Sequence, residues 1–99
     1  MKLREIAYSR SGDKGDTSNI CVFVYEKSDY DRLKAGLTAD VVRDRFGSLV
    51  RGGVVRYEIP RAHGLNFVLT GALGGGVSMT VRADPHGKSF QSLVLDIDI

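Results

Sequence analysis

The chain has 99 residues, of which 42% are hydrophobic and 26% are charged. This length supports one hydrophobic core, so we expect a single domain over residues 1–99. The net charge of +2 is small, and the basic residues are not gathered on one strip as they are in nucleic-acid binders. The composition therefore argues against a disordered chain and against a nucleic-acid partner.

The charged N-terminus, the short apolar stretches and the single cysteine argue against further classes of protein. No apolar stretch is long enough to cross a bilayer, and the charged N-terminus lacks the hydrophobic segment of a signal peptide. We therefore expect a cytoplasmic protein with no membrane partner. An internal disulfide is impossible, and the apolar neighbours of Cys21 predict a buried small hydrophobic residue rather than a nucleophile. No Cys or His spacing predicts a metal site.

The first half of the chain predicts two strands and two helices. Alternation predicts a strand over residues 3–9, a polar loop over 10–18, and a strand over 19–25 that is apolar on both faces and therefore central. A short helix is expected to begin near Ser28 and end at Gly36. A second is expected over 39–46, with Thr38 as its N-cap and Gly47 as its C-cap.

The second half predicts three strands and one helix. Residues 54–59 alternate as a strand that buries Val55, Tyr57 and Ile59. The apolar spacing over 63–73 predicts a short helix. Residues 77–82 and 90–99 predict strands joined by a turn at 84–87, where proline and glycine favour chain reversal.

The polar segment Gly12–Asn19 is the first candidate site. It contains Gly12, Asp13, Lys14, Gly15, Asp16 and Asn19. Its glycines would expose backbone N–H groups to an anion, with Lys14 adding charge, while the two acids would bind a cation or orient Lys14. The alternative, equally weighted, is a loop that satisfies its own hydrogen bonds through Asx turns.

A looser second set consists of Arg56, Asn66, Arg82 and Asp84. Arg56 and Arg82 are expected on the polar faces of two strands, where both would reach one acidic ligand if the strands are neighbours. We favour the alternative, cross-strand pairing with Glu58 or Asp84.

The glycine-rich and histidine-containing turns favour structural roles. Gly74, Gly75 and Gly76 precede an expected strand rather than a helix, so they predict a helix stop and not a dinucleotide-binding loop. His86 is expected to be a solvated turn residue, because a catalytic histidine needs a carboxylate or substrate beside it. Gly87, Lys88 and Ser89 match the end of a phosphate-binding loop, but Arg82 stands where the first glycine of that motif belongs, so we reject such a loop.

Several segments together resemble one known family. They are Gly12–Asp16 followed by Asn19 and Ile20, Arg56–Pro60, Leu65–Leu69, Ala72–Gly76, Arg82 with Asp84, and Gly87 with Lys88. In this order they resemble the ferredoxin-fold domain of the AtuA-like (acyclic terpene utilisation) family over nearly the whole chain. With the element order, the resemblance implies an α+β, ferredoxin-like two-layer sandwich. The expected sheet is mixed, with about five strands and helices mainly on one face.

The resemblance also implies a role. In that family the domain usually follows a much larger region, so the chain is expected to be a stand-alone small subunit with a larger AtuA-like partner. The family is associated with breakdown of acyclic terpenoids and other branched acids as CoA thioesters. No cofactor and no catalytic residue is implied, although a CoA thioester is a possible substrate of the complex. The candidates for a ligand site or interface are Gly12, Asp13, Lys14, Gly15, Asp16, Asn19, Arg56, Asn66, Gly74, Gly75, Gly76, Arg82, Asp84, His86 and Lys88.

Two other functions are carried as alternatives. One is a stand-alone small enzyme or ligand-binding protein that acts on an acidic metabolite through the Gly12–Asn19 loop. The other is a homo-oligomeric structural module. We rank the subunit first. A ligand pocket of about 300 Å³ or more takes space inside the domain, and so short a chain needs that space for its hydrophobic core.

Overall fold

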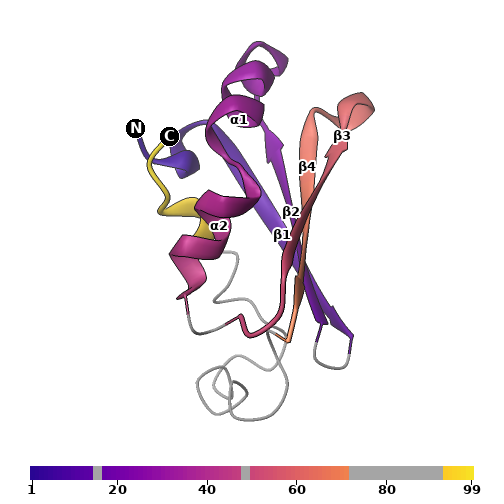
Figure 1. Ribbon diagram of the computed structural model, residues 1–99. Helices are drawn as coiled ribbons and strands as arrows, with labels where there is room; N and C mark the ends of the chain where they lie inside the picture. The colour runs from indigo at the N-terminus through magenta and orange to yellow at the C-terminus, as the bar shows by residue number, and fades with distance from the viewer. Residues whose placement is uncertain (15–16, 48–49, 72–92) are drawn as a thin grey trace.

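A computed structural model of the protein describes residues 1–14, 17–47, 50–71 and 93–99. In these residues one antiparallel sheet of order β1-β2-β4-β3 is covered on one side by two helices (Figure 1). The elements are β1 (Ala7–Lys14), β2 (Thr17–Val24), α1 (Tyr30–Gly36), α2 (Ala39–Phe46), β3 (Val54–Ile59) and β4 (Gly64–Thr70). The expected α+β class, with helices mainly on one face, is confirmed.

The connections explain the ferredoxin-like character of the fold. Strands β2 and β3 are both antiparallel to β4, which lies between them, so β2 and β3 run parallel to each other. The helices connect them, which makes a split β-α-β unit of the ferredoxin-like kind. The N-terminal β1 pairs with the free edge of β2.

The expected strand number and sheet type are wrong for the described residues. Four strands are present there instead of about five, and every pairing is antiparallel rather than mixed. The expected strand over 77–82 lies outside the described residues.

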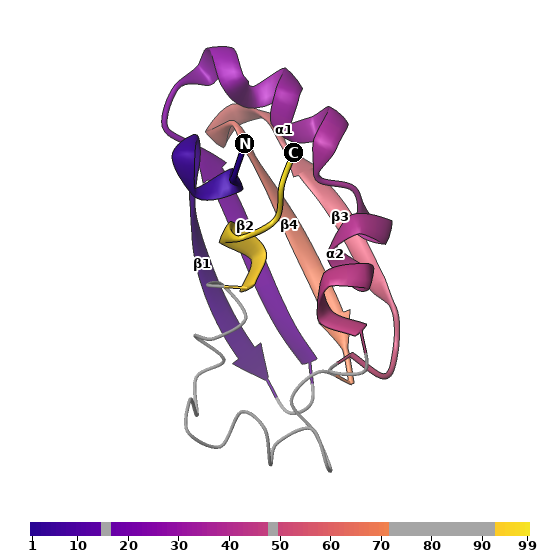
Figure 2. The ribbon, with the colours of Figure 1, turned by 90° about the vertical axis from the view of Figure 1, so that its left-hand side faces the viewer.

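Figure 2 shows the helices lying over one face of the sheet, and the core side chains lie between these two layers. Alternate residues of the two central strands face the helical layer, because successive side chains of a strand point to opposite sides. The most deeply buried members, each 0% exposed, are Leu3, Ile20, Val22, Leu33, Leu37, Val42, Leu65, Phe67, Leu69 and Val94. The apolar character of this face fixes the register of the sheet, because a slip of one residue would turn these side chains to solvent.

The second helix is the element that local chemistry predicts best. It spans Ala39–Phe46, and the Thr38 hydroxyl accepts a hydrogen bond from the Val41 N–H at 3.2 Å. Gly47 has φ of 53°, the left-handed region in which glycine is favoured. The cap positions and the helix limits are confirmed. The first helix ends at Gly36 as expected, but Ser28 lies in a 3-10 turn that precedes it.

The helix expected over 63–73 is wrong, because residues Gly64–Thr70 form strand β4. Its odd-numbered apolar residues, Leu65, Phe67 and Leu69, are buried, while Asn66 and Val68 lie on the opposite face. A period of two fits this burial better than a period of 3.6. As a strand, the segment also provides main-chain partners for both β2 and β3.

The polar loop expected over 10–18 is a β-hairpin in its described part. Strands β1 and β2 pair through it, with Gly12 opposite Asn19 and Lys14 opposite Thr17. The buried Ser18 hydroxyl donates to the Gly12 carbonyl at 3.1 Å. The polar residues Ser18 and Asn19 thus belong to a strand rather than a loop, and their side chains form hydrogen bonds there.

The two chain ends correct two further expectations. Residues Leu3–Glu5 form a 3-10 turn before β1 instead of opening a strand, and residues 93–95 are helical rather than extended. The ends pair with each other: the Leu3 N–H donates to the Ile97 carbonyl at 2.8 Å, and the Ile99 N–H donates to the Met1 carbonyl at 3.0 Å. The 3-10 turn and the C-terminal segment therefore close the core on the helical side.

The face of β3 is the reverse of the expected one. Val55 and Tyr57 are 48% and 54% exposed, whereas Arg56 lies on the helical side. The Arg56 guanidinium donates to the carbonyls of Lys34 and Leu37, at 2.7 and 3.0 Å. These carbonyls end α1 and lack partners within the helix, so the arginine satisfies them.

In the part of the chain that the structure describes, neither helix is long and apolar enough to cross a membrane.

Candidate functional site

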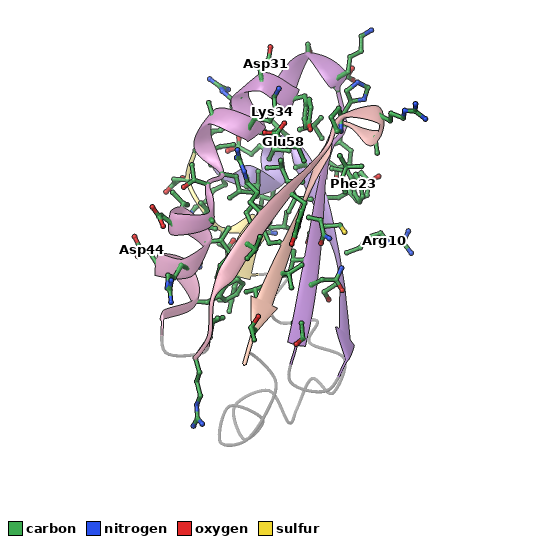
Figure 3. All side chains as sticks on the ribbon, turned by 45° about the vertical axis from the view of Figure 1, so that its right-hand side comes forward. Arg10, Phe23, Asp31, Lys34, Asp44 and Glu58 are labelled. Carbon is green, nitrogen blue, oxygen red and sulfur yellow. The ribbon has the colours of Figure 1, made fainter. Side chains whose placement is uncertain are left out.

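Among the residues that the structure describes, no helix or strand covers the face of the sheet opposite the helices, and the strand register arranges the residues of this face in rows. One row runs from Arg10 through Cys21 and Asn66 to Tyr57. Cross-strand partners lie on the same face of a sheet. Figure 3 shows Arg10 and Phe23 pointing away from the helical layer. We call this side the open face, defined by Tyr8, Arg10, Gly12, Asn19, Cys21, Phe23, Val55, Tyr57, Ile59, Gly64, Asn66 and Val68.

A hollow of about 320 Å³ lies on the open face over the β1-β2 hairpin. Its lining residues are Arg10, Ser11, Gly12, Asn19, Cys21 and Phe23. A Cβ atom at position 12 would lie 3.0 Å from the Asn19 Oδ1 atom, which is tighter than most Cβ contacts. Glycine at this position therefore keeps the hollow open beside Asn19.

Two amides and a thiol form a hydrogen-bonded group beside the hollow. The Asn66 Oδ1 atom accepts from the Asn19 Nδ2 atom and from the Cys21 Sγ atom, each at 3.4 Å. The Asn19 Nδ2 atom also lies 3.8 Å from the Cys21 Sγ atom. These contacts hold the Asn66 carbonyl toward β2.

Cys21 is half-buried on this face, so the expectation of a core residue is wrong. Partial burial raises the pKa of its thiol, while the hydrogen bond from Asn19 and the charge of Arg10 act in the opposite direction with smaller effect. A raised pKa keeps the group protonated at neutral pH. The thiol is therefore a weak hydrogen-bond donor here rather than an activated nucleophile.

Aromatic rings gather at one end of the open face. The Tyr8 ring centroid lies 5.5 Å from that of Phe23 and 5.4 Å from that of Tyr25. Tyr8 is 41% exposed and Tyr25 is 64% exposed. We call these three residues the aromatic cluster.

Three of the predicted site residues meet in the structure. Gly12, Asn19 and Asn66 come from three strands and lie in or beside the hollow. The backbones of Asp13 and Lys14 belong to β1, but their side chains lie outside the described part of the structure. The other candidates lie outside the described residues altogether: Gly15, Asp16, Gly74, Gly75, Gly76, Arg82, Asp84, His86 and Lys88.

Arg56 does not join this group, because it faces the helices. Its expected pairing with Glu58 is confirmed at 3.6 Å, although the two residues lie on one strand rather than across strands. The Arg56 guanidinium donates to carbonyls at the end of α1, and its binding of an acidic ligand stays a prediction.

Sequence reasoning missed Arg10, Cys21 and Phe23 as residues of the hollow. The signal that would have found them is the hairpin register. Once Gly12 pairs with Asn19, alternation places Arg10 opposite Cys21 on the same face. Among the residues described here, no three His, Cys, Asp or Glu side chains cluster as ligands for a metal ion.

In the described part of the chain, the split β-α-β unit and the helical layer on one side of the sheet define a two-layer α+β domain of the ferredoxin-like class. The family model described as the AtuA ferredoxin-like domain matches residues 1–99. The chain therefore belongs to this family over its whole length. No curated protein and no solved structure matches the chain.

Proposed function

We propose that this domain is the small subunit or accessory domain of an AtuA-like acyl-CoA catabolism complex. Its open face would complete a site or interface with a larger AtuA-like subunit. The observation that carries the proposal is a sheet face that lacks a covering layer in the described residues and presents aromatic side chains to solvent. The acyl-CoA role itself is inferred from membership of the family.

The composition of the open face supports a protein partner. Interface cores are enriched in Tyr, Phe and Arg and depleted in Lys, Glu, Asp, Ser and Ala. The residues that define the open face include Tyr8, Phe23, Tyr57 and Arg10, which are of the enriched types. The helical side is different, since exposed charged residues such as Asp31 and Asp44 project from it (Figure 3). The two sides of the molecule thus differ in the way expected of an interface and a solvated surface.

The size of the hollow supports a shared rather than a self-contained site. Its volume of about 320 Å³ lies at the lower end of ligand pockets, which bury most of a bound ligand. A CoA thioester is far larger than such a hollow. A second protein surface laid over the open face would supply the missing walls.

The experiment is co-expression with a large AtuA-like family member, followed by measurement of the affinity of the complex. Tyr57→Glu places a charge on the open face and should weaken binding about tenfold or more, as expected for an aromatic hot-spot residue. Ala35→Glu is the matched control, because Ala35 is exposed on α1. Thermal unfolding of both variants establishes that each is folded.

The predicted result is one complex that is sensitive to Tyr57→Glu and insensitive to Ala35→Glu. Failure of the two proteins to associate, or equal effects of both variants, would contradict the proposed interface. For the chemistry, CoA thioesters should bind and turn over in the complex and not with the small chain alone. Turnover by the isolated chain would favour the alternative of a stand-alone enzyme.

A further inference from the structure

We infer that the outer edge of β3 pairs with the same edge of a second copy of this chain. The pairing is antiparallel and joins the two four-stranded sheets across a twofold axis. The inference goes beyond the proposed function, because it concerns the edge of the sheet and is measured on the 99-residue chain alone. The proposed function concerns the open face and a different protein, so either can fail without the other.

The main-chain groups of β3 are the first argument. In the described part of the chain β3 pairs only with β4. The Thr70 N–H donates to the Gly53 carbonyl at 3.0 Å, just before β3 begins. Hydrogen-bonded and non-bonded pairs alternate along an antiparallel ladder, so the odd-numbered residues of β3 direct their main-chain groups to β4. The even-numbered residues, Val54, Arg56 and Glu58, therefore direct theirs away from the sheet.

The residue types of β3 are the second argument. The strand is rich in valine, isoleucine and tyrosine, which favour extended structure. Lysine and proline, which natural proteins place on exposed edges to prevent pairing, are absent from Val54–Ile59. Val55 and Tyr57 are also exposed. Strand β1, at the other end of the sheet, consists mainly of small and charged residues and is less suited to pairing.

The charges of β3 select a second copy as the partner and fix the register. Residues whose main-chain groups point outward must face each other to exchange hydrogen bonds, which leaves two central registers. In one of them Arg56 faces Arg56 of the second copy, and like charges directly opposite are destabilising. In the other, Arg56 faces Glu58 of the second copy and Glu58 faces its Arg56. This register brings opposite charges together on both sides of the axis, so we assign it to the dimer.

The surroundings of Arg56 allow it to meet a second carboxylate. Its Nη1 atom donates to the Lys34 and Leu37 carbonyls, and its Nη2 atom lies 3.6 Å from the Glu58 Oε2 atom. A guanidinium has five N–H donors, so N–H groups remain on the Nη2 and Nε atoms after the contacts to α1. The Glu58 side chain is about half-exposed, which leaves it free to turn toward the second copy.

The assigned register also joins the two open faces. Tyr57 then faces Tyr57 of the second copy, and Val55 faces its Ile59, which are aromatic and aliphatic pairs of the kind that stabilise neighbouring strands. Pairing one short strand per copy buries less surface than a standard interface of about 1,600 Å². We therefore expect a dimer that dissociates on dilution.

The first test is sedimentation equilibrium of the chain over roughly 10 µM to 1 mM, a range in which a weak dimer is populated. Glu58→Arg places an arginine opposite Arg56 of the second copy and should weaken dimerisation about tenfold or more. Glu26→Arg makes the same change of charge at an exposed position after β2, which β4 separates from β3, and should leave the dimer unchanged. Thermal unfolding establishes that both variants are folded. A monomer at every concentration, or equal weakening by the two variants, would overturn the inference.

The second test checks the register by cross-linking, in a Cys21→Ser background that removes the one natural thiol. Tyr57→Cys places two cysteines directly opposite each other in a non-hydrogen-bonded pair, where Cα atoms lie about 4.5 Å apart and a disulfide can form. Mild oxidation should therefore give a covalent dimer. Tyr25→Cys is the control, because Tyr25 is exposed and lies outside β3.

The cross-linking result decides between the second copy and other occupants of the edge. A high yield from Tyr57→Cys and a low yield from Tyr25→Cys supports the assigned register. Equal yields would reveal chance collisions and contradict it. A chain that stays monomeric, and whose Arg56 and Glu58 amides gain protection from hydrogen exchange only with the larger subunit, would give the edge to that partner and overturn the inference.

Discussion

The ring of Phe23 lies directly over Gly64. A Cβ atom at position 64 would overlap the Phe23 Cδ1 atom and would lie 2.8 Å from the Val22 carbonyl oxygen. Phe23 and Gly64 are paired across β2 and β4, so the ring covers a residue that has no side chain of its own. Covering a strand glycine with an aromatic ring from the next strand pins the register of the two strands.

Gly64→Ala should therefore destabilise the domain. The new methyl group must displace both the ring and the β2 backbone, and overpacking of this kind costs about 1–3 kcal/mol. Urea unfolding measures the change in free energy. Gly53→Ala is the matched control, because nothing lies within 4 Å of a Cβ atom there and its φ is not positive. Equal stability of the two variants would show that Phe23 does not rest on Gly64.

Arg56→Met should loosen the junction between α1 and α2. The substitution removes the donors to the Lys34 and Leu37 carbonyls, and loss of charged hydrogen bonds from a side chain that is 23% exposed should cost about 2 kcal/mol. Urea unfolding gives the size of the loss, and amide hydrogen exchange in α1 locates it. Glu58→Gln removes only the half-exposed ion pair with Arg56, so its effect should stay within about 1 kcal/mol. A larger loss in Glu58→Gln than in Arg56→Met would contradict this role.

The elements that the sequence predicts well are those fixed by neighbours in the chain. Thr38 and Gly47 limit α2 through contacts within a few residues, so the sequence contains the information needed to place them. The segment Gly64–Thr70 is different, since a short apolar run fits a helix or a strand equally well. Its conformation is decided by β2 and β3, whose main-chain groups it pairs.

The candidate site was predictable only in part, for the same reason. Gly12, Asn19 and Asn66 stood out as unusual residue types, and the fold brings them together. Arg10 and Cys21 are recognised as neighbours only once the hairpin register is known. The sequence predicted a loop over 10–18, and a loop has no such register. On β3, no described element covers Val55 and Tyr57, and Arg56 faces the helices because its guanidinium donates to the Lys34 and Leu37 carbonyls. None of these contacts is local in sequence.

Cys21 should react slowly with iodoacetamide at neutral pH and faster as the pH rises. Burial raises the pKa of the thiol above its ordinary value of 9.0, and only the thiolate reacts. The pH dependence of alkylation, followed by mass spectrometry, should lie at higher pH for the folded chain than for the chain in urea. Arg10→Gln removes a positive charge that favours the thiolate, so it should slow alkylation further, and Arg61→Gln should not. A folded-state profile at lower pH than the unfolded one would contradict this picture.

Asp96 should make stability depend on acid pH. The hydrogen bond from the Arg4 guanidinium, with the charges of Arg4, Lys2 and Arg45, lowers the pKa of this carboxyl below its ordinary value of 3.8. A group whose pKa is lower in the folded state contributes stability that is fully present above the unfolded pKa. That contribution is lost as the pH falls below 3.8 and through the folded-state pKa.

Thermal unfolding between neutral pH and pH 3 should therefore show a smaller loss of stability in Asp96→Asn than in the unmodified chain, because the variant has no proton to take up at this position. Asp44→Asn on α2 removes a carboxylate that has no ion pair in the described residues, so it serves as the control for net charge. Because Arg4 bridges the N-terminal turn to the C-terminal segment, Arg4→Gln should reproduce the weaker pH dependence of Asp96→Asn. A pH profile of Asp96→Asn that matches the unmodified chain would show that this pairing of the two chain ends adds nothing to the stability of the fold.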